Sequence, residues 1–239
     1  GEVLDAIGKP IYAYGNDRLE IASVKLYTDG ALGSRGAAMI EPYSDDPENR
    51  GLPFWTQQEL DAMVEKANGM GFQVGIHAIG DLGNRMALDS FARVQGGKPS
   101  PLRNRIEHSQ IVTLEDIPRF AELGVIASMQ PSHAIGDLHF APDRLGPGRL
   151  DGAYPWRALI DAGSIIAGGS DALCQLTYAG FNALRSVDQV ACRPFRADRE
   201  GLSLGEGAGV VVLESEEHAR RLAVVRGGHT GQRGSEPEH

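Results

Sequence analysis

Patterns of buried strands alternate with helix patterns through residues 24–168 of this chain. Each strand pattern is a short apolar run, and each helix pattern places apolar residues three and four positions apart. Strands that alternate with helices form right-handed βαβ units and a parallel sheet. The sequence therefore predicts an α/β fold with about five parallel strands, at residues 24–28, 72–78, 105–109, 125–129 and 164–168.

The predicted helices carry recognisable start signals. Thr56 and Glu59 have the spacing of a capping box for a helix over residues 56–70. A long polar loop is expected over 131–151, before a short helix over 154–162. Caps for the two helices between these segments are predicted at Asp81 and at Thr113 with Asp116.

Side chains that can bind a metal follow three of the predicted strands. His77, His108 and Asp171 each stand at the carboxyl end of a strand, and Lys25 lies within the first strand. In a closed βα barrel all carboxyl ends of the strands meet at one mouth, so these side chains would converge. A single histidine after a strand is more often a core residue, and a single lysine a solvated charge. The set of candidates at one end of a repeat favours a metal site.

The chemistry of these residue types supports a hydrolytic site. Imidazole and carboxylate groups are zinc ligands, and catalytic zinc lowers the pKa of a bound water to about 7. Asp171 could serve as a ligand or as the base that moves the proton to the leaving group. Lys25, expected to be buried among apolar neighbours, could be neutral or carry a carboxylate adduct that bridges metals.

Charge and composition exclude several classes of partner. The net charge of −9 and the pI near 5.3 disfavour binding to nucleic acid. No apolar run approaches the roughly 20 residues of a membrane span, so no membrane partner is expected. The two cysteines form neither a disulfide framework nor a metal pair, which suits a cytoplasmic protein. The expected ligand is a small molecule.

Five segments in order resemble the motifs of the amidohydrolase superfamily, in particular amidohydrolase family 3: VKLYTDGALGSRGAA, GFQVGIHAIGDLGNR, RIEHSQ, ASMQPSHAIGD and AGGSDA. The resemblance implies the later half of a (β/α)8 TIM barrel that hydrolyses amide or similar carbon–nitrogen bonds through one or two divalent metals, with zinc expected. It implies metal-site roles for Lys25, His77, His108 and Asp171, with Asp171 also catalytic. His133 matches a loop position over the mouth and would contact substrate, or would be an exposed polar residue.

Two features of that family have no counterpart here. The first metal motif, a His-x-His pair, is absent from the sequence, and so are patterns for the first three strands. Five strands without the others expose two sheet edges, through which the chain could self-associate. We therefore expect a truncated enzyme that is weakly active or inactive.

The segment over residues 166–219 is similar to an internal part of an elongating β-ketoacyl synthase, a condensing enzyme with the thiolase fold. The resemblance implies an alternative function, acyl transfer to an acyl carrier protein substrate in fatty-acid or polyketide synthesis. The nucleophilic cysteine of that family lies outside the matching segment, and Cys174 and Cys192 do not match it.

The two resemblances together predict a chimera with three parts. A partial amidohydrolase barrel over 1–171 would precede a β-ketoacyl synthase-like fragment over 172–226 and a disordered tail over 227–239. The apolar run at 207–213 is predicted to be a strand. We expect residues 173–219 to pack separately rather than complete the barrel.

Overall fold

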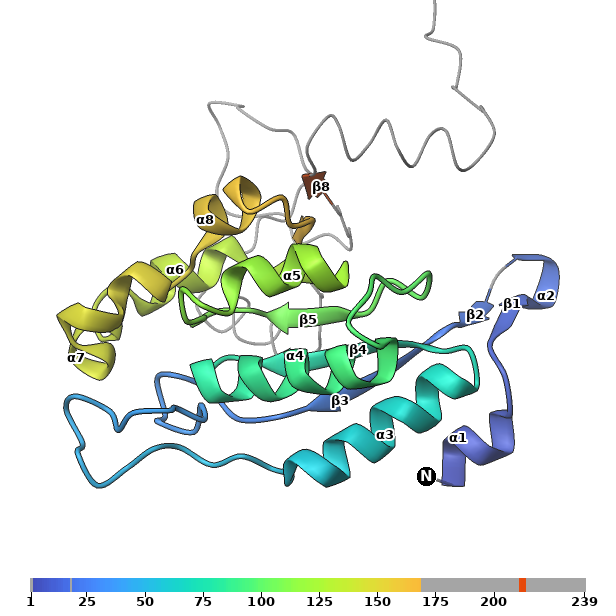
Figure 1. Cartoon of the computed structure of the whole chain (residues 1–239), viewed down its shortest axis with the longest axis horizontal. Coiled ribbons are helices and arrows are strands. Elements are labelled where there is room, and N and C mark those ends of the chain that lie inside the picture. The colour runs from blue at the N-terminus through green and yellow to red at the C-terminus, as the bar shows by residue number, and fades with distance from the viewer. Residues whose placement is uncertain (1, 18, 169–210, 214–239) are drawn as a thin grey trace, which may run out of the picture. The chain divides into compact units, whose positions relative to one another are not determined.

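The computed structural model of the chain describes residues 2–17, 19–168 and 211–213 (Figure 1). It begins with helix α1 (Glu2–Ile7) and a small hairpin of β1 (Ile11–Ala13) and β2 (Leu19–Ile21). The turn between the two strands, α2 (Tyr14–Asp17), passes through left-handed conformations at Gly15 and Asn16. These elements were not predicted, because three-residue strands leave almost no periodic pattern.

The central sheet has the predicted α/β architecture. Its strand order is β3-β4-β5-β6-β7-β8, and the pairs from β3 to β6 are parallel. The first five strands coincide with the five predicted runs to within two residues at either end, which confirms the predicted fold. The strands are β3 (Ser23–Tyr27), β4 (Gln73–Ala78), β5 (Arg105–His108), β6 (Ile126–Met129), β7 (Ile166–Gly168) and β8 (Val211–Leu213).

Strand β8 falls within the run predicted to be a strand, and the sheet order places it beside β7. The sequence also predicts a helix over residues 176–187, a short helix over 216–221 and the disordered tail over 227–239. All of these lie outside the described residues.

Helix α3 (Gln57–Gly69) begins as its sequence predicts. Thr56 is the N-cap, and its hydroxyl accepts a hydrogen bond from the Glu59 N–H at 3.3 Å, while the Glu59 carboxylate accepts from the Thr56 N–H at 2.9 Å. The capping box satisfies two amides that have no partner within the helix. Before it, the Trp55 indole donates to the Tyr27 carbonyl at 2.8 Å and ties the helix entry to β3.

The caps of the next two helices differ in part from prediction. Helix α4 (Asp81–Gln95) has Gly80 as its N-cap, and Asp81 is instead its first residue. The Asp81 carboxylate accepts from the Leu82 and Ile40 amides, both at 2.8 Å, and so joins the helix start to an earlier loop. In helix α5 (Ile117–Leu123), Asp116 is the N-cap, and the Thr113 hydroxyl donates to its carboxylate at 2.8 Å.

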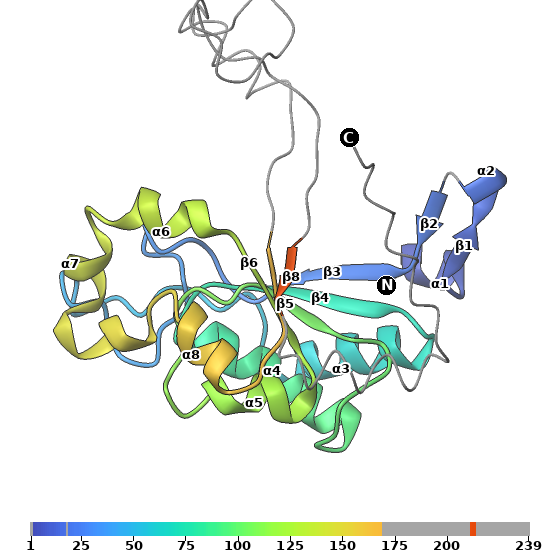
Figure 2. The same cartoon turned by 90° about the horizontal axis from the view of Figure 1, so that it is seen from above.

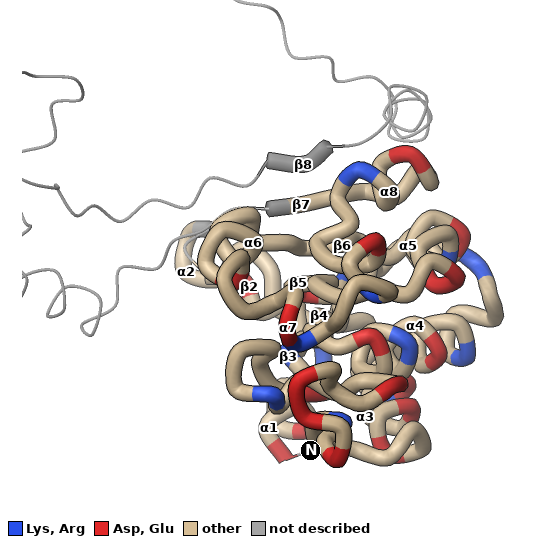
Figure 3. Tube along the Cα trace, turned by 90° about the vertical axis from the view of Figure 1, so that its left-hand side faces the viewer, with Lys and Arg blue, Asp and Glu red and all other residues tan. Residues whose placement is uncertain are grey.

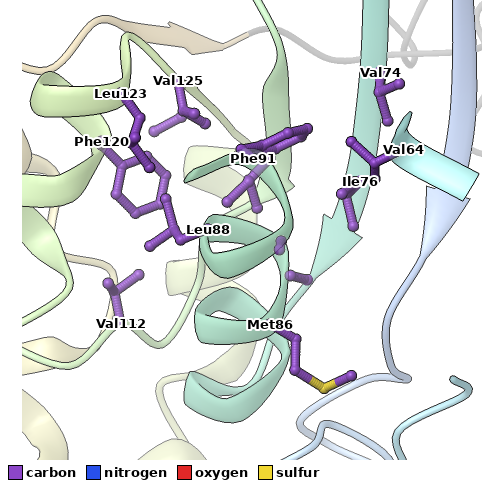
Figure 4. Close-up of a cluster of buried hydrophobic side chains, with 14 of the residues drawn as sticks. Val64, Val74, Ile76, Met86, Leu88, Phe91, Val112, Phe120, Leu123 and Val125 are labelled. Carbon is purple, nitrogen blue, oxygen red and sulfur yellow. The ribbon is translucent and has the colours of Figure 1, made fainter. Parts of the chain in front are cut away.

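Helices α3, α4 and α5 cover one face of the sheet (Figure 2). Between them lies a continuous apolar core, part of which is drawn in Figure 4. Leu88 of α4 and Phe120 of α5 point toward one another, while Val64 of α3 lies beside Ile76 of β4. These side chains are fully buried, and each such burial is worth about 1.5–3 kcal/mol relative to exposure.

Acidic and basic residues alternate on the outer surfaces of these helices (Figure 3). Arg93 of α4 pairs with Asp61 of α3 at 3.1 Å, and Arg119 of α5 pairs with Asp89 of α4 at 2.6 Å. Asp61 is buried, but each pair has one exposed member, Arg93 or Asp89, and ion pairs at a protein surface contribute about 0–1 kcal/mol, so the apolar core is the main source of stability. None of the helices in the described ranges is long and apolar enough to cross a membrane.

The region predicted as a long polar loop over 131–151 contains helices. Each of them has proline near its start, where the missing N–H does no harm. Ala141 and Leu145 are buried against Leu32 and Tyr43 in a second apolar cluster, which holds this region against a glycine-rich loop over residues 29–36. The loop prediction was wrong because burial of only a few apolar side chains, Ala141 and Leu145 among them, holds these short helices in place, and so few apolar residues leave no helical pattern in the sequence. The elements are α6 (Pro131–Asp137), α7 (Ala141–Leu145), η1 (Pro147–Gly152) and then the expected α8 (Trp156–Asp161).

Candidate functional site

His77 and His108 meet at the carboxyl ends of two adjacent parallel strands. His77 is the penultimate residue of β4, and His108 is the last residue of β5, in register with Ala78. The two ring centroids are 4.5 Å apart, and the rings meet edge to face at 71°. The predicted convergence of these side chains is therefore present in the fold.

Strand β5 ends in an unusual backbone conformation. His108 has a φ of 77° and Ser109 a φ of 45°, both in the left-handed region that non-glycine residues rarely adopt. Such a conformation costs about 1–3 kcal/mol for each residue and tends to occur at functional sites. The bend therefore lies at the residue that carries the imidazole, where the strand ends.

Both imidazoles have a buried nitrogen without a hydrogen-bond partner, Nε2 of His77 and Nδ1 of His108. Burial, with the charges of His77 and His133 adding to it, lowers the pKa of His108 to about 4. Burial also lowers the pKa of His77, and the Lys25 charge contributes in the same direction. Both rings are therefore neutral at pH 7, which is the form that binds metal.

His133 completes a row of three imidazoles. It lies on α6, half-buried, and its ring stacks on that of His108 with centroids 5.2 Å apart and planes 10° from parallel. The sequence left open whether this residue contacts the site or is exposed in a loop. The structure places it on a helix and against the site.

Lys25 is not buried among apolar neighbours as predicted. Its side chain is exposed, with Nζ 5.0 Å from the ring centre of Tyr27. Among the described residues, strand β3 has a sheet neighbour on one side only, and Lys25 pairs in register with Gly75, which has no side chain to cover it. Partial burial still lowers the pKa of Lys25, opposed by the negative charge of Glu107.

Asp171 lies outside the described residues, so the structure does not test its position. In the ranges the structure describes, no group of three or more His, Cys, Asp or Glu side chains is arranged to hold a metal ion. The described part of the site therefore offers two neutral imidazoles with buried, unpartnered nitrogens. These fit a metal as part of a ligand set, and the remaining ligands would come from elsewhere.

Asp29 belongs to the site and was missed by the sequence analysis. Its carboxylate is 1% exposed, and Oδ1 lies 3.6 Å from Nε2 of His77. Burial raises its pKa to about 6, although three backbone amides oppose the rise. The only sequence signal was its place as the second residue after β3, at the start of the glycine-rich loop over residues 29–36.

Glu107 and Arg105, which lie on β5 near His77 and His108, were also not predicted from the sequence as site residues. Arg105 Nε donates to the Glu107 carboxylate, and both side chains lie over Gly75, where an added Cβ would be 3.1 Å from Glu107 Oε1. Burial raises the pKa of Glu107, but the Ser128 hydroxyl and Arg105 outweigh it, so the pKa is lowered. A charged carboxylate is thus held near the imidazole row.

A pocket of about 170 Å³ lies apart from the imidazoles. None of His77, His108 and His133 lines it. Its walls come from the segment after β5 and from η1, and they consist of Asp81, Ile111, Val112, Thr113, Leu114, Gly148, Arg149, Asp151 and Gly152.

Comparison with known proteins gives a consistent match for most of the chain. A family described as "Amidohydrolase family" matches residues 2–190. The putative amidohydrolase YtcJ of Bacillus subtilis is 32% identical over 198 residues, covering 82% of this chain and 36% of that protein. The crystal structure of an uncharacterized metal-dependent hydrolase from Pyrococcus horikoshii covers 67% of this chain and 32% of its own, with 37% identity and a TM-score of 0.59.

A second kind of relative matches a smaller part. The 3-oxoacyl-[acyl-carrier-protein] synthase 2 of Rhizobium meliloti is 45% identical over 104 residues, which is 40% of this chain and 21% of that protein. The chain spans about a third of the length of YtcJ and about a fifth of this synthase.

Proposed function

Because the chain belongs to the amidohydrolase family, we propose that it is a metal-dependent hydrolase of carbon–nitrogen bonds of the amide type. The observation that carries the proposal is the contact between His77 and His108, each with a buried nitrogen that has no protein partner. Leaving a buried polar atom unpaired costs about 1–3 kcal/mol, so a metal at Nδ1 of His108 and a hydrogen bond at Nε2 of His77 would each remove a penalty. The hydrolase activity is a proposal, because this chain spans 36% of the length of YtcJ.

His77 and His108 would hold a divalent metal, and we propose zinc because imidazole nitrogen is a ligand of that ion. When bound, zinc supplies a Lewis acid for a carbonyl oxygen and makes water a nucleophile at neutral pH. Asp171 would complete the site as a ligand or as the base that passes a proton to the leaving nitrogen. Lys25 would support it from β3.

The neighbouring side chains would bind and orient the substrate. His133 lies on α6 with its ring parallel to that of His108, so it can contact a small molecule that reaches the imidazole row. We propose that turnover by this chain is weak or absent, because its seven histidines include no His-x-His pair. Loss of even outer partners of a metal site typically reduces affinity or activity by about 10 to 100-fold.

Metal content measured by mass spectrometry on purified protein tests the proposal. The double variant His77→Ala with His108→Ala should lose the bound zinc, and His139→Ala, an exposed histidine against Phe140, should keep it. Equal metal in all three proteins would reject the proposal.

A second candidate is an acyl-transferring function of the part of the chain that matches a synthase, in a chimeric cytoplasmic protein. Its support is the 45% identity to a 3-oxoacyl-[acyl-carrier-protein] synthase. A chloroacetyl thioester analogue should alkylate Cys174 and Cys192 no faster than it alkylates free cysteine if both are ordinary thiols. Labelling of either cysteine at a much higher rate than free cysteine would favour the synthase function.

A further inference from the structure

The Asp29 carboxylate is built into the end of β4 by three backbone amides. Oδ2 accepts from the N–H groups of Ala38 at 2.9 Å and Gly80 at 2.8 Å, and Oδ1 accepts from Ile79 at 3.0 Å. The side chain is fully buried, so its position is fixed by these bonds and not by solvent. Its two oxygens are used unequally.

The unequal use leaves one acceptor direction of Oδ1 toward His77. A carboxylate oxygen accepts two hydrogen bonds, and Oδ2 already has two. The Thr28 hydroxyl lies 3.4 Å from Oδ1, but its single hydrogen is better directed to the His77 carbonyl at 2.7 Å. The remaining neighbour of Oδ1 is Nε2 of His77, buried at 3.6 Å and without a closer partner.

We infer that Asp29 is a positioning residue that holds a proton on Nε2 of His77 and so directs Nδ1 toward the bound ligand. The inference deepens the proposed function and rests on it. A histidine that binds metal usually donates its other ring N–H to a carboxylate or carbonyl, which fixes the tautomer and the ring orientation. Here a small closing movement of the ring would turn the 3.6 Å contact into that hydrogen bond.

Packing around Asp29 prevents the carboxylate from moving away. A Cβ added at Gly83 would lie 2.7 Å from Asp29 Oδ2 and 2.9 Å from the Thr28 hydroxyl, closer than atoms normally approach.

The backbone carbonyl of Gly30 is a competing hydrogen-bond acceptor for the His77 ring. A hydrogen bond to a carboxylate is roughly twice as strong as one to a neutral acceptor, so Asp29 should dominate.

The tautomer of His77 in the full chain tests the inference directly. Long-range ¹H–¹⁵N NMR on metal-free, ¹⁵N-histidine-labelled protein at pH 8 should show His77 with its proton on Nε2. His77→Gln identifies the signal. A proton on Nδ1, as expected if Gly30 is the partner, would overturn the inference using the wild-type protein alone.

The variant Asp29→Asn gives a second readout. Its amide oxygen can accept from Ala38 and Gly80, which turns the NH₂ group toward His77 at the cost of the hydrogen bond from Ile79, and this should move the ring proton to Nδ1. The His108 tautomer in the same spectrum should stay unchanged and serves as the internal control for folding. An unchanged His77 tautomer in a folded Asp29→Asn protein would also contradict the inference.

Metal binding separates this inference from the proposed function. Zinc affinity of the wild type, measured by competition with a chelating dye, should fall by about 10 to 100-fold in Asp29→Asn. A wild type that binds no zinc but has the Nε2 proton refutes the hydrolase proposal and leaves the positioning role standing. Zinc bound with equal affinity by both proteins refutes the positioning role alone.

Discussion

The carbonyl oxygen of His77 accepts two hydrogen bonds from Thr28, one from its amide at 2.9 Å and one from its hydroxyl at 2.7 Å. The first continues the pairing of β3 with β4 by one residue, and the second adds a side-chain bond at the same place. The carboxyl end of β3 is thereby fastened to the strand residue that carries the imidazole. The site is rigid at this point because both partners are in or next to the sheet.

Replacing Thr28 by valine removes the hydroxyl bond and keeps the shape. The free energy of unfolding should fall by about 1 kcal/mol, the usual net value of such a bond. Urea denaturation followed by circular dichroism measures it. Thr28→Ser retains the hydroxyl and should recover most of the loss, whereas a serine variant less stable than the valine variant would show that the methyl group matters more than the hydroxyl bond.

Truncating Leu88 to alanine should destabilise the protein by about 2–5 kcal/mol. Its side chain is fully buried between α4 and α5, opposite Phe120, so the substitution leaves a cavity (Figure 4). Leu114→Ala, at a leucine that is 61% exposed, is the matched control and should change stability by less than about 0.5 kcal/mol. Similar values for both would argue against the described core.

Stability should decline in acid in part through Asp116. Burial raises its pKa, but hydrogen bonds from Arg119, Thr113 and Arg85 outweigh burial and hold the pKa below its usual value. A carboxyl group with a lowered folded pKa stabilises the fold above its unfolded pKa, near 3.8, and the contribution is lost as pH falls through the folded value.

Urea midpoints across the acid range check this. Asp116→Asn should be less stable than wild type at pH 7, and the difference should shrink below about pH 4. Glu48→Gln, at an exposed carboxylate, should track the wild type throughout. A gap between Asp116→Asn and wild type that is constant with pH would contradict the assignment.

Amide hydrogen exchange should be faster in β8 than in β4. Strand β4 has neighbours on both sides and buried residues on both faces, whereas β8 stands last in the sheet order. Mass spectrometry of peptides covering residues 73–78 and 207–213 gives the comparison. Equally slow exchange of both in a monomer would show that the region after β7 has become an integrated part of the fold.

The strands and the meeting of His77 with His108 could be predicted from sequence because both depend on order along the chain. Alternation of strand and helix fixes a parallel sheet, and a parallel sheet gathers its carboxyl ends. Periodic patterns also located α3 and its capping box, since those interactions span only a few residues.

Other features depended on contacts between distant segments. The exposure of Lys25 depends on which segments lie beside β3 at the edge of the described sheet, and the sequence around Lys25 does not reveal this. Asp29 acquires its role only when residues 38 and 79–80 come to surround it. The helices within 131–151 are stabilised by burial against the glycine-rich loop, about 100 residues earlier in the chain.

The left-handed backbone at His108 and Ser109 lowers the stability of the fold and at the same time fixes the backbone that carries an imidazole of the site. A glycine at position 109 would relieve left-handed strain and could raise the melting temperature, yet it would free the backbone that aims the neighbouring imidazole. Selection for heat resistance alone would therefore favour substitutions at these two residues. Variants recovered in that way would be expected to gain robustness while the separation of the two histidines became less defined.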